Sequence, residues 1–361
     1  MEKQASDGVT ANGSRYAQVA GGAGGISARG VLSAYLLPHP PIIVPEVGHG
    51  RENDASSTVQ AMTLAGAEIA AARPDVIVLV SPHAPVARGG RIHMSAARSF
   101  RGNLRQFGAA GVELSFGGDP GFANSISEAA ARVGIIAGDA MPASRSGEGK
   151  PASLDHGAMV PLYFIDREYR RARAKAGGGE NGSDLPKLLL ISVALLSGDI
   201  LYRFGACVAD TAFIRGLRAV FIASGDLSHK LSDDGPYGYN PAGPKFDRHI
   251  VDCIRDGNTR GILGIDEGLL EDSAQCGYYG IAMMRGAIER AAELRADAAP
   301  SAIGAPGASE NAPGAPGSTS SPVSPGSPVS PVPPVPVIRS EVYSYESPFG
   351  IGYAVTRSSI E

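Results

Sequence analysis

Three short runs of almost continuous apolar residues alternate with helix-like segments along this chain. They lie at 75–81 (DVIVLVS), 187–194 (KLLLISVA) and 219–224 (AVFIAS). Strands that are apolar on both faces are typical of a parallel sheet that helices cover on both sides. With a further strand predicted at 31–37 (VLSAYLL), the pattern indicates a single α/β domain with a largely parallel central sheet.

Helical spacing of apolar residues predicts the helices that flank this sheet. The predicted helices span 55–72, 122–133, 200–217, 245–255, 259–265 and 277–294. Near the end of the chain, 337–344 (VIRSEVYS) and 352–356 (GYAVT) enclose a Ser-Pro-Phe-Gly turn, which predicts a C-terminal β-hairpin. We therefore expect the chain to leave the domain near residue 300 and to return to finish its sheet.

Three segments have compositions that do not build a core. Residues 1–29 are rich in Gly, Ser and Ala, and residues 300–336 are rich in Pro, Gly, Ser and Ala, so we expect both to be disordered. Residues 170–184 (RRARAKAGGGENGSD) are charged and Gly-rich, which predicts a surface loop. The ordered domain is then formed by 30–299 and 337–358.

Charge and cysteine usage argue against several classes of protein. A net charge of −4 is unlike the basic balance of a nucleic-acid-binding protein. The three cysteines, Cys207, Cys253 and Cys276, form no CxxC pair, which argues against a disulfide scaffold or a cysteine-rich zinc module. No apolar run reaches the roughly 20 residues of a membrane helix, and the N-terminus has no signal-peptide core. A cytoplasmic protein that does not enter the membrane is expected.

Histidines follow three of the predicted strands. His39 follows the first strand in LLPHPP, His83 follows the second in LVSPHAP, and His229 follows a later strand in IASGDLSH. Because ligands bind beyond the carboxyl ends of the strands in open α/β sheets, we expect these imidazoles to meet at one edge. Prolines beside His39 and His83 stiffen their loops, which favours a fixed metal ligand.

Other candidates are less clear from the sequence. His156, in LDHGAMVPL, is either a fourth residue of this site or the cap of the helix that follows it. Cys276 lies at the start of a predicted helix, where the dipole stabilises a thiolate, although a free cysteine is more often simply buried. The remaining histidines, His49, His93 and His249, lie outside the strand-end motifs and are expected at the surface.

Two neutral imidazoles and one anionic ligand form a divalent-metal site with open positions. A carboxylate as the third ligand is typical of ferrous oxygenases, whereas a thiolate favours zinc or copper. Other chemistries lack their motifs, because the sequence contains no GxSxG elbow, no GxxxxGKS/T phosphate loop and no HExxH helix.

Six runs of sequence together resemble the class III extradiol ring-cleavage dioxygenase superfamily, whose members are LigB-like. The runs are PHPPIIVPEVG (38–48), VLVSPHAP (78–85), LDHGAMVPLYFI (154–165), FIASGDLSHKL with DGPYGYNPAGPKFD (221–247), CGYYGIAMMRGA (276–287) and SYESPFGIGYAV (344–355). The chain is most similar to the LigB/Memo-like domain of AmmeMemoRadiSam system proteins. The resemblance spans 31–356 without the insertions, and it implies a LigB-like catalytic domain.

The resemblance implies a mononuclear metal site, which holds Fe(II) in the dioxygenases. Matched by motif, His39 and His83 would be the two histidine ligands. The dioxygenases have a glutamate as third ligand, and Cys276 stands at that position here, as in the Memo-like branch. Glu271 is an upstream carboxylate and a weaker substitute. Because a thiolate changes metal preference, copper or zinc are the alternatives to iron.

The resemblance also implies catalytic roles. His229 would be the acid–base residue that handles the proton of a substrate hydroxyl group, and His156 would be a second polar contact in the pocket. Asp226, in the same SGDLSH segment as His229, is a further catalytic candidate.

Three functions follow as hypotheses. The first is a non-haem Fe(II) oxidoreductase that acts with O2 on a small aromatic substrate, as extradiol dioxygenases do. The second is a Memo-like metal-binding protein that acts with a radical-SAM or AMMECR-domain partner and cleaves no ring. The third, which is weaker, is zinc-dependent hydrolysis with His229 as the base. A homodimer is compatible with each of them.

Overall fold

The computed structural model describes residues 29–85, 89–139, 150–175, 185–298 and 336–361. The predicted N-terminal tail and the predicted Pro-rich insertion lie outside the described residues, apart from residues 29 and 336. Statements below about the structure concern the described part of the chain.

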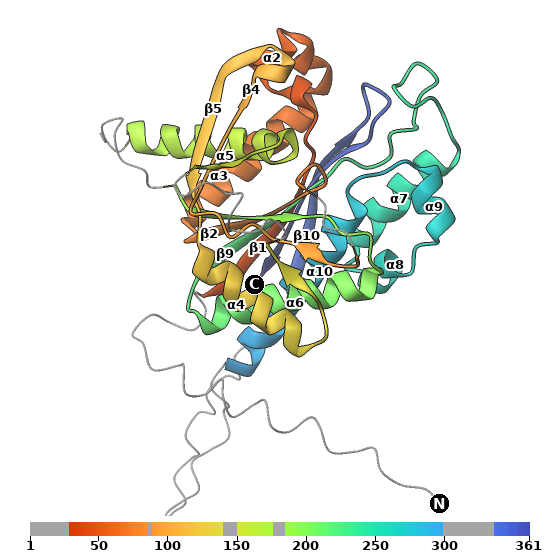
Figure 1. Ribbon diagram of the computed structural model, residues 1–361. Coiled ribbons are helices and arrows are strands. Elements are labelled where there is room, and N and C mark those ends of the chain that lie inside the picture. Colours follow the sequence, from red (N-terminus) through yellow and green to blue (C-terminus); the bar gives the residue numbers. More distant parts are fainter. Residues whose placement is uncertain (1–28, 86–88, 140–149, 176–184, 299–335) are drawn as a thin grey trace, which may run out of the picture.

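A six-stranded sheet forms the centre of the molecule (Figure 1), in the order β10–β11–β1–β9–β2–β8. The neighbouring strands from β1 to β8 run parallel. They are β1 (Gly30–Leu37), β9 (Arg218–Ser224), β2 (Val76–Ser81) and β8 (Lys187–Ser192). The predicted C-terminal hairpin is formed by β10 (Ile338–Glu346) and β11 (Tyr353–Ile360), and β11 pairs antiparallel with β1. The prediction of an α/β domain with a largely parallel sheet and a terminal hairpin is therefore confirmed.

The sheet has an apolar core on each face. In β2, Val78 and Val80 pack into one core, whereas Ile77 and Leu79 pack into the other, and all four side chains are buried. Alternate residues of a strand point to opposite faces, so a strand covered on both sides has to be apolar throughout. This explains the apolar runs of the sequence.

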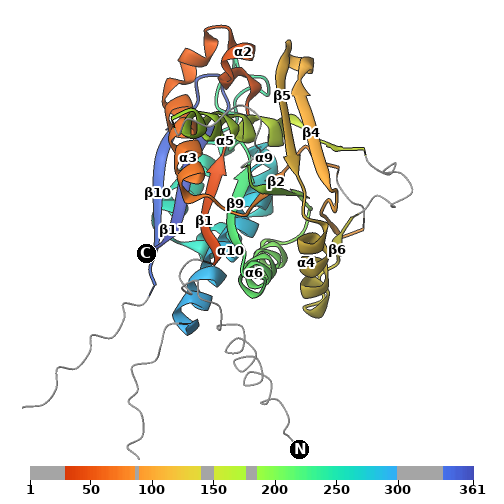
Figure 2. The same ribbon diagram turned by 90° about the vertical axis from the view of Figure 1, so that its left-hand side faces the viewer.

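Long helices cover the two faces (Figure 2). The helices on one face are α4 (Pro120–Arg132), α6 (Gly198–Ile214), α7 (Ala242–Arg255) and α10 (Tyr278–Ala298). The helices on the other face are α3 (Ser56–Ala72) and α5 (His156–Lys175). The short elements are η3 (Pro41–Ile43), α2 (Pro45–Gly48), η4 (Arg51–Ala55), β3 (Ile92–His93), η5 (Arg105–Phe107), β6 (Ala137–Gly138), β7 (Ala152–Ser153), α8 (Thr259–Leu263) and α9 (Glu267–Asp272). Within the described ranges, no helix has both the length and the apolar character needed to span a membrane.

Helix α5 is longer than the sequence indicates. The segment from residue 170 was expected to be a surface loop, but residues 170–175 continue the helix. Ion pairs between Asp166 and Arg170 and between Glu168 and Arg171, each with an N–O distance of 2.6 Å, join neighbouring turns. Pairs at this spacing stabilise a helix. The rest of the predicted loop, 176–184, lies outside the described residues.

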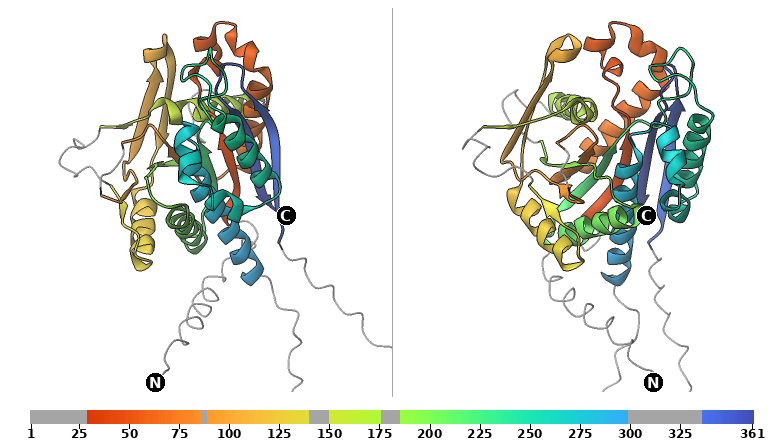
Figure 3. Two further views of the ribbon diagram at one scale, coloured as in Figure 1. Left: turned by 90° about the vertical axis from the view of Figure 1, so that its right-hand side faces the viewer. Right: turned by 45° about the vertical axis from the view of Figure 1, so that its right-hand side comes forward.

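A second, smaller sheet was not predicted. It contains β4 (Ser99–Leu104) and β5 (Ala109–Gly117), which form an antiparallel hairpin, and the short strand β7. Figure 3 shows the hairpin standing apart from the six-stranded sheet, next to α5. Only one face of it is buried, so its sequence lacks the long apolar run that marks the central strands.

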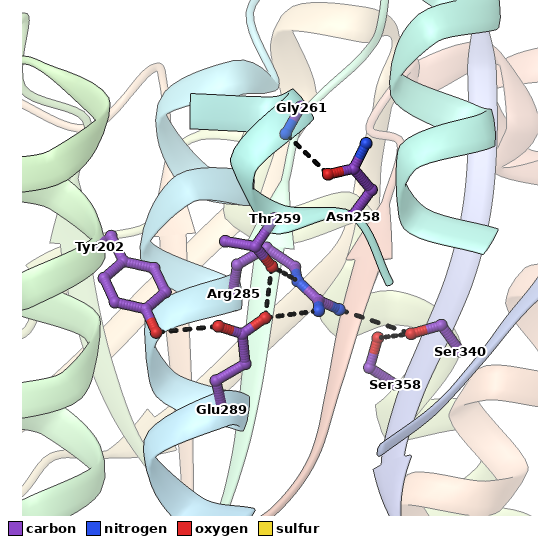
Figure 4. Close-up of polar contacts among 8 residues, drawn as sticks. All are labelled: Tyr202, Asn258, Thr259, Gly261, Arg285, Glu289, Ser340 and Ser358. Carbon is purple, nitrogen blue, oxygen red and sulfur yellow. Dashed lines mark hydrogen bonds and ion pairs between the residues drawn. The ribbon is translucent and has the colours of Figure 1, made fainter. Parts of the chain in front are cut away.

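A buried polar network connects α10 to the elements around it (Figure 4). The side chain of Arg285 is 2% exposed, and its Nη2 lies 2.7 Å from Glu289 Oε1. Its Nε donates to Thr259 Oγ1 at 2.9 Å, and its Nη1 donates to Ser340 Oγ at 3.4 Å. The Tyr202 hydroxyl of α6 donates to the other oxygen of Glu289 at 2.8 Å. A buried charge is tolerated only when it is paired and hydrogen-bonded, so this network fixes α6, α8 and the hairpin around α10.

Candidate metal centre

The candidate site lies at the carboxyl edge of the parallel strands. His39 follows β1, His83 follows β2 and Asp226 follows β9, which pairs with both β1 and β2. His156 is the first residue of α5, and Cys276 lies two residues before α10 begins. His39 and His83 therefore occupy the same edge of the sheet as His156 and Cys276, the two candidates that were less clear from the sequence.

The imidazoles of His39, His83 and His156 lie against one another. The Nε2 atoms of His39 and His83 are 3.1 Å apart. The ring centroids of His83 and His156 are 3.9 Å apart, and those of His39 and His156 are 5.6 Å apart. Each of the three offers a nitrogen within 4.8 Å of the others, so together they form a group that could hold a cation. His39 is buried and His83 is exposed, so the group opens to solvent on the His83 side.

A hydrogen-bond relay fixes the tautomer of His39. Its Nδ1 lies 3.0 Å from Ser224 Oγ, and the Ser224 hydroxyl donates to the carbonyl oxygen of Gly157 at 2.5 Å. Because the serine proton is committed to Gly157, Ser224 accepts the proton of His39 Nδ1. The Nε2 lone pair of His39 then points into the cluster, as a metal ligand requires. Ser224 is a supporting residue that the sequence motifs did not single out.

Cys276 and Asp226 form a second group of donors with His39. Cys276 Sγ is 3.9 Å from His39 Nε2, and the backbone N–H of Asp226 donates to this sulfur at 3.2 Å. Asp226 Oδ1 accepts from the backbone N–H of His39 at 2.9 Å. This approach requires glycine at Gly225, because an added Cβ there would lie 2.3 Å from the Cα of Gly277. Sequence and packing thus bring the SGDLSH loop directly against the start of α10.

Two groups of donors therefore share His39. In the described part of the chain, His39, His83 and His156 form one group, and His39, Asp226 and Cys276 form the other. The ligand set implied by the family resemblance takes one residue from each group beside His39. Glu271, the upstream carboxylate, is exposed on α9 and belongs to neither group.

Burial controls the protonation of these groups. Burial, together with repulsion from His83 and His156, holds the pKa of His39 well below its usual range. Burial and the neighbouring His83 lower the pKa of His156 to about 4. Both imidazoles are therefore neutral near pH 7, with lone pairs available. Burial raises the pKa of Asp226 to about 6.

The thiol of Cys276 does not behave as its sequence position suggests. The sequence left open a thiolate stabilised by the dipole of the following helix or a simply buried cysteine; burial, and then the charge of Asp226, raise the pKa of this thiol. The desolvation of a buried anion outweighs the dipole, whose effect is confined to the first turn of a helix. The protein without metal therefore holds a neutral thiol, and a bound cation would displace its proton.

Two of the donor distances match those around a single small cation, whereas His83 and Cys276 do not belong to one group of donors that lie within 4.8 Å of one another. Two nitrogen ligands at roughly 2.1 Å from a zinc ion are separated by about 3.0–3.4 Å at the usual angles. The 3.1 Å between the two Nε2 atoms lies in this range. A nitrogen and a sulfur at roughly 2.1 and 2.3 Å would be 3.9 Å apart at an angle of about 125°, and 3.9 Å is the separation of His39 Nε2 and Cys276 Sγ.

His229 lies at the edge of the centre with an uncommitted nitrogen. Its backbone N–H donates to the carbonyl of Ser273 at 3.2 Å, and its ring packs edge-on against Tyr237 with centroids 5.3 Å apart. Its Nδ1 is buried and has no hydrogen-bond partner among the described residues. The loop is held by Asp247, whose Oδ1 accepts from the backbone N–H of Ser228 at 2.7 Å. Burial raises the pKa of Asp247 to about 7, and the sequence did not mark it as part of the site.

The remaining histidines and cysteines have other surroundings. His49 is exposed, as expected, but the expectation for His93 is wrong: it is 5% exposed, and its Nδ1 lies 3.9 Å from Asp139 Oδ1. It lies in β3, a two-residue strand too short to recognise from its sequence. His249 is half-buried, and its Nε2 lies 2.8 Å from the carbonyl of Gly261. Cys207 and Cys253 are buried.

A parallel sheet with imidazoles, a carboxyl group and a thiol gathered at its carboxyl edge defines an α/β protein with a candidate metal centre. The chain belongs to the LigB family, because the family described as the catalytic LigB subunit of aromatic ring-opening dioxygenase matches residues 33–305. The resemblance noted in the sequence is thereby confirmed at the level of the family.

Two known proteins are similar to this chain to different degrees. Protein CA_C1420 of Clostridium acetobutylicum is 36% identical over 255 residues, which make up 71% of this chain and 51% of that protein. The chain thus spans about half the length of this curated relative. The crystal structure of the uncharacterized protein JW3007 from Escherichia coli K12 is similar with a TM-score of 0.49 and 12% identity, over 91% of this chain and 99% of that one.

Proposed function

We propose that this chain is a metal-dependent oxidoreductase that holds Fe(II) at His39, His83 and Cys276 and acts with O2 on a hydroxylated aromatic substrate. The observation that supports this most strongly is the convergence of donor atoms on His39, with His83 Nε2 at 3.1 Å and Cys276 Sγ at 3.9 Å. The family to which the chain belongs is described as the catalytic subunit of an aromatic ring-opening dioxygenase, and this supports the proposed class of reaction.

The protein supplies binding, orientation and proton transfer in this proposal. When bound, Fe(II) supplies the Lewis-acid and redox chemistry that a reaction between O2 and a phenol requires. The relay through Ser224 keeps Nε2 of His39 unprotonated for binding. The exposed side of His83 provides the approach for a substrate. His229, whose Nδ1 has no hydrogen-bond partner among the described residues, would handle the proton of a substrate hydroxyl, and the nearby charge of Asp226 would stabilise the imidazolium that forms.

A second function is favoured by one observation, the thiol of Cys276 in place of a carboxylate. Thiolate ligands favour zinc or copper, whereas a carboxylate ligand is typical of the iron site in ferrous oxygenases. In this second proposal the same centre binds metal but cleaves no ring, and the chain acts with a radical-SAM or AMMECR-domain partner.

Oxygen uptake separates the two functions. We expect the protein, purified anaerobically and loaded with Fe(II), to consume O2 with at least one member of a catechol panel and to form a ring-opened product. His229→Ala should retain its iron and lose roughly 100-fold or more of the rate, as is typical when an acid–base group is removed. Iron-loaded protein that consumes no O2 with any catechol would overturn the first proposal in favour of the second.

A further inference from the structure

A large cavity opens beside the candidate metal centre. Its volume is about 910 Å³, near the upper end of the range for sites that bind drug-sized ligands. It is lined by residues of the β4–β5 hairpin, of the segment before α5, and of the histidine cluster. His83 and His156 contribute to both the cavity and the candidate metal centre. A single catechol ring would fill only a small part of this space.

The hairpin is tied to the centre by the backbone. Strand β4 pairs with β7, with Arg101 opposite Ser153, and the N–H of Leu154 donates to the carbonyl of Arg101 at 3.0 Å. His156 follows two residues later, and its ring lies 5.3 Å from that of Phe107 at the end of the hairpin turn. The backbone at the tip of β4 is therefore held at a fixed position relative to the histidines.

Charged side chains of both signs line the cavity. Asp155 lines it next to His156, and Arg101 and Arg105 line it from the hairpin. Arg101 is already paired with Glu113 of the neighbouring strand. Arg105 has no ion-pair partner in the part of the chain that the structure describes, and it is exposed. Asn103 and Gln106 beside it add polar groups.

We propose that this cavity binds the substrate of the metal centre, and that the substrate is larger than a single aromatic ring and carries a carboxylate or phosphate that Arg105 binds. This inference rests on the proposed function, since it concerns the substrate of the same centre. A guanidinium binds these anions through paired hydrogen bonds. In this proposal the reacting ring lies toward His83 and His156, and the anionic group lies against Arg105 of the hairpin.

Binding of matched two-ring probes tests this proposal without requiring turnover. The probes are 1-naphthyl phosphate, 1-naphthoate and 1-naphthol, titrated calorimetrically into the metal-loaded protein. We expect at least one anion to bind roughly tenfold or more tightly than naphthol, as for other hydrogen bonds to charged groups. Arg105→Ala should remove this preference, and Arg105→Lys should restore part of it. The ratio between phosphate and carboxylate identifies which anion the site prefers.

The controls separate this inference from the proposed function. Arg255→Ala, which removes an exposed arginine paired with Asp252 on α7, should leave probe binding unchanged. Metal content is measured in every variant, and Arg105→Ala should keep its metal. Equal binding of naphthol and both anions, or an anion preference that survives Arg105→Ala, would overturn the proposal even if the centre binds metal. If the wild-type protein itself bound no metal, that result would instead count against the proposed function.

Discussion

His39→Ala is expected to abolish stoichiometric metal binding, with a loss of affinity of at least about 100-fold. His39 belongs to both groups of donors, so its removal breaks each of them. His83→Ala should have a similar effect, because it removes the nitrogen that lies 3.1 Å from His39 Nε2. Metal content after anaerobic reconstitution and dialysis, measured by elemental analysis, checks both variants.

Substitutions of residues around His39 should lower the metal affinity by different amounts. Ser224→Ala removes the group that orients the ring, and the loss of such a supporting contact costs roughly 10–100-fold in metal affinity. His229→Ala should retain metal, and His49→Ala, at an exposed histidine, should match the wild type. Metal retained at full stoichiometry in both His39→Ala and His83→Ala would refute the assignment of the ligands.

Gly286→Ala is expected to lower the stability of the protein strongly, although it adds only one methyl group. An added Cβ at Gly286 in α10 would lie 1.9 Å from the carbonyl oxygen of Tyr202 in α6. Gly205 of α6 makes the reciprocal approach, where a Cβ would lie 1.9 Å from the carbonyl oxygen of Met283. Backbone atoms cannot swing aside, so the two helices would have to separate.

The expected net effect combines two opposing contributions. Overpacking costs up to about 3 kcal/mol, whereas alanine is better than glycine inside a helix by about 1 kcal/mol. The free energy of unfolding should therefore fall by about 2 kcal/mol, measured by urea denaturation. Gly111→Ala is the control, since no atom lies within 4 Å of a Cβ added there, and it should change stability by less than about 0.5 kcal/mol. Equal stability of both variants would show that the α6–α10 contact is not tight.

The central fold could be predicted because burial on both faces leaves a strong mark in sequence. The strands β2, β8 and β9 are apolar except at their ends, and they were identified within two residues at either end. The β4–β5 hairpin has one solvated face and interrupting glycines, so its pattern is weaker. Helix α5 continues to Lys175 because ion pairs between neighbouring turns stabilise it, although the composition of this segment indicates a loop.

The candidate site was predictable to the extent that it lies at strand ends. Topology alone brings His39, His83 and Asp226 to one edge of the sheet. The supporting residues Ser224 and Asp247 act through hydrogen bonds to a ring nitrogen and a loop N–H, and such contacts have no sequence signature. The raised pKa of the Cys276 thiol follows from burial in the folded protein, which a position before a helix does not reveal.

X-ray absorption spectroscopy of the zinc-loaded protein tests most directly whether His39, His83 and Cys276 bind one ion. Zinc reports the ligand set without any reaction with O2. The account predicts one sulfur neighbour at roughly 2.3 Å together with nitrogen or oxygen neighbours at roughly 2.0–2.1 Å. The sulfur neighbour should disappear in Cys276→Ser while the imidazole scattering remains. A shell of light atoms alone in the wild-type protein would contradict the assignment of Cys276 as a ligand.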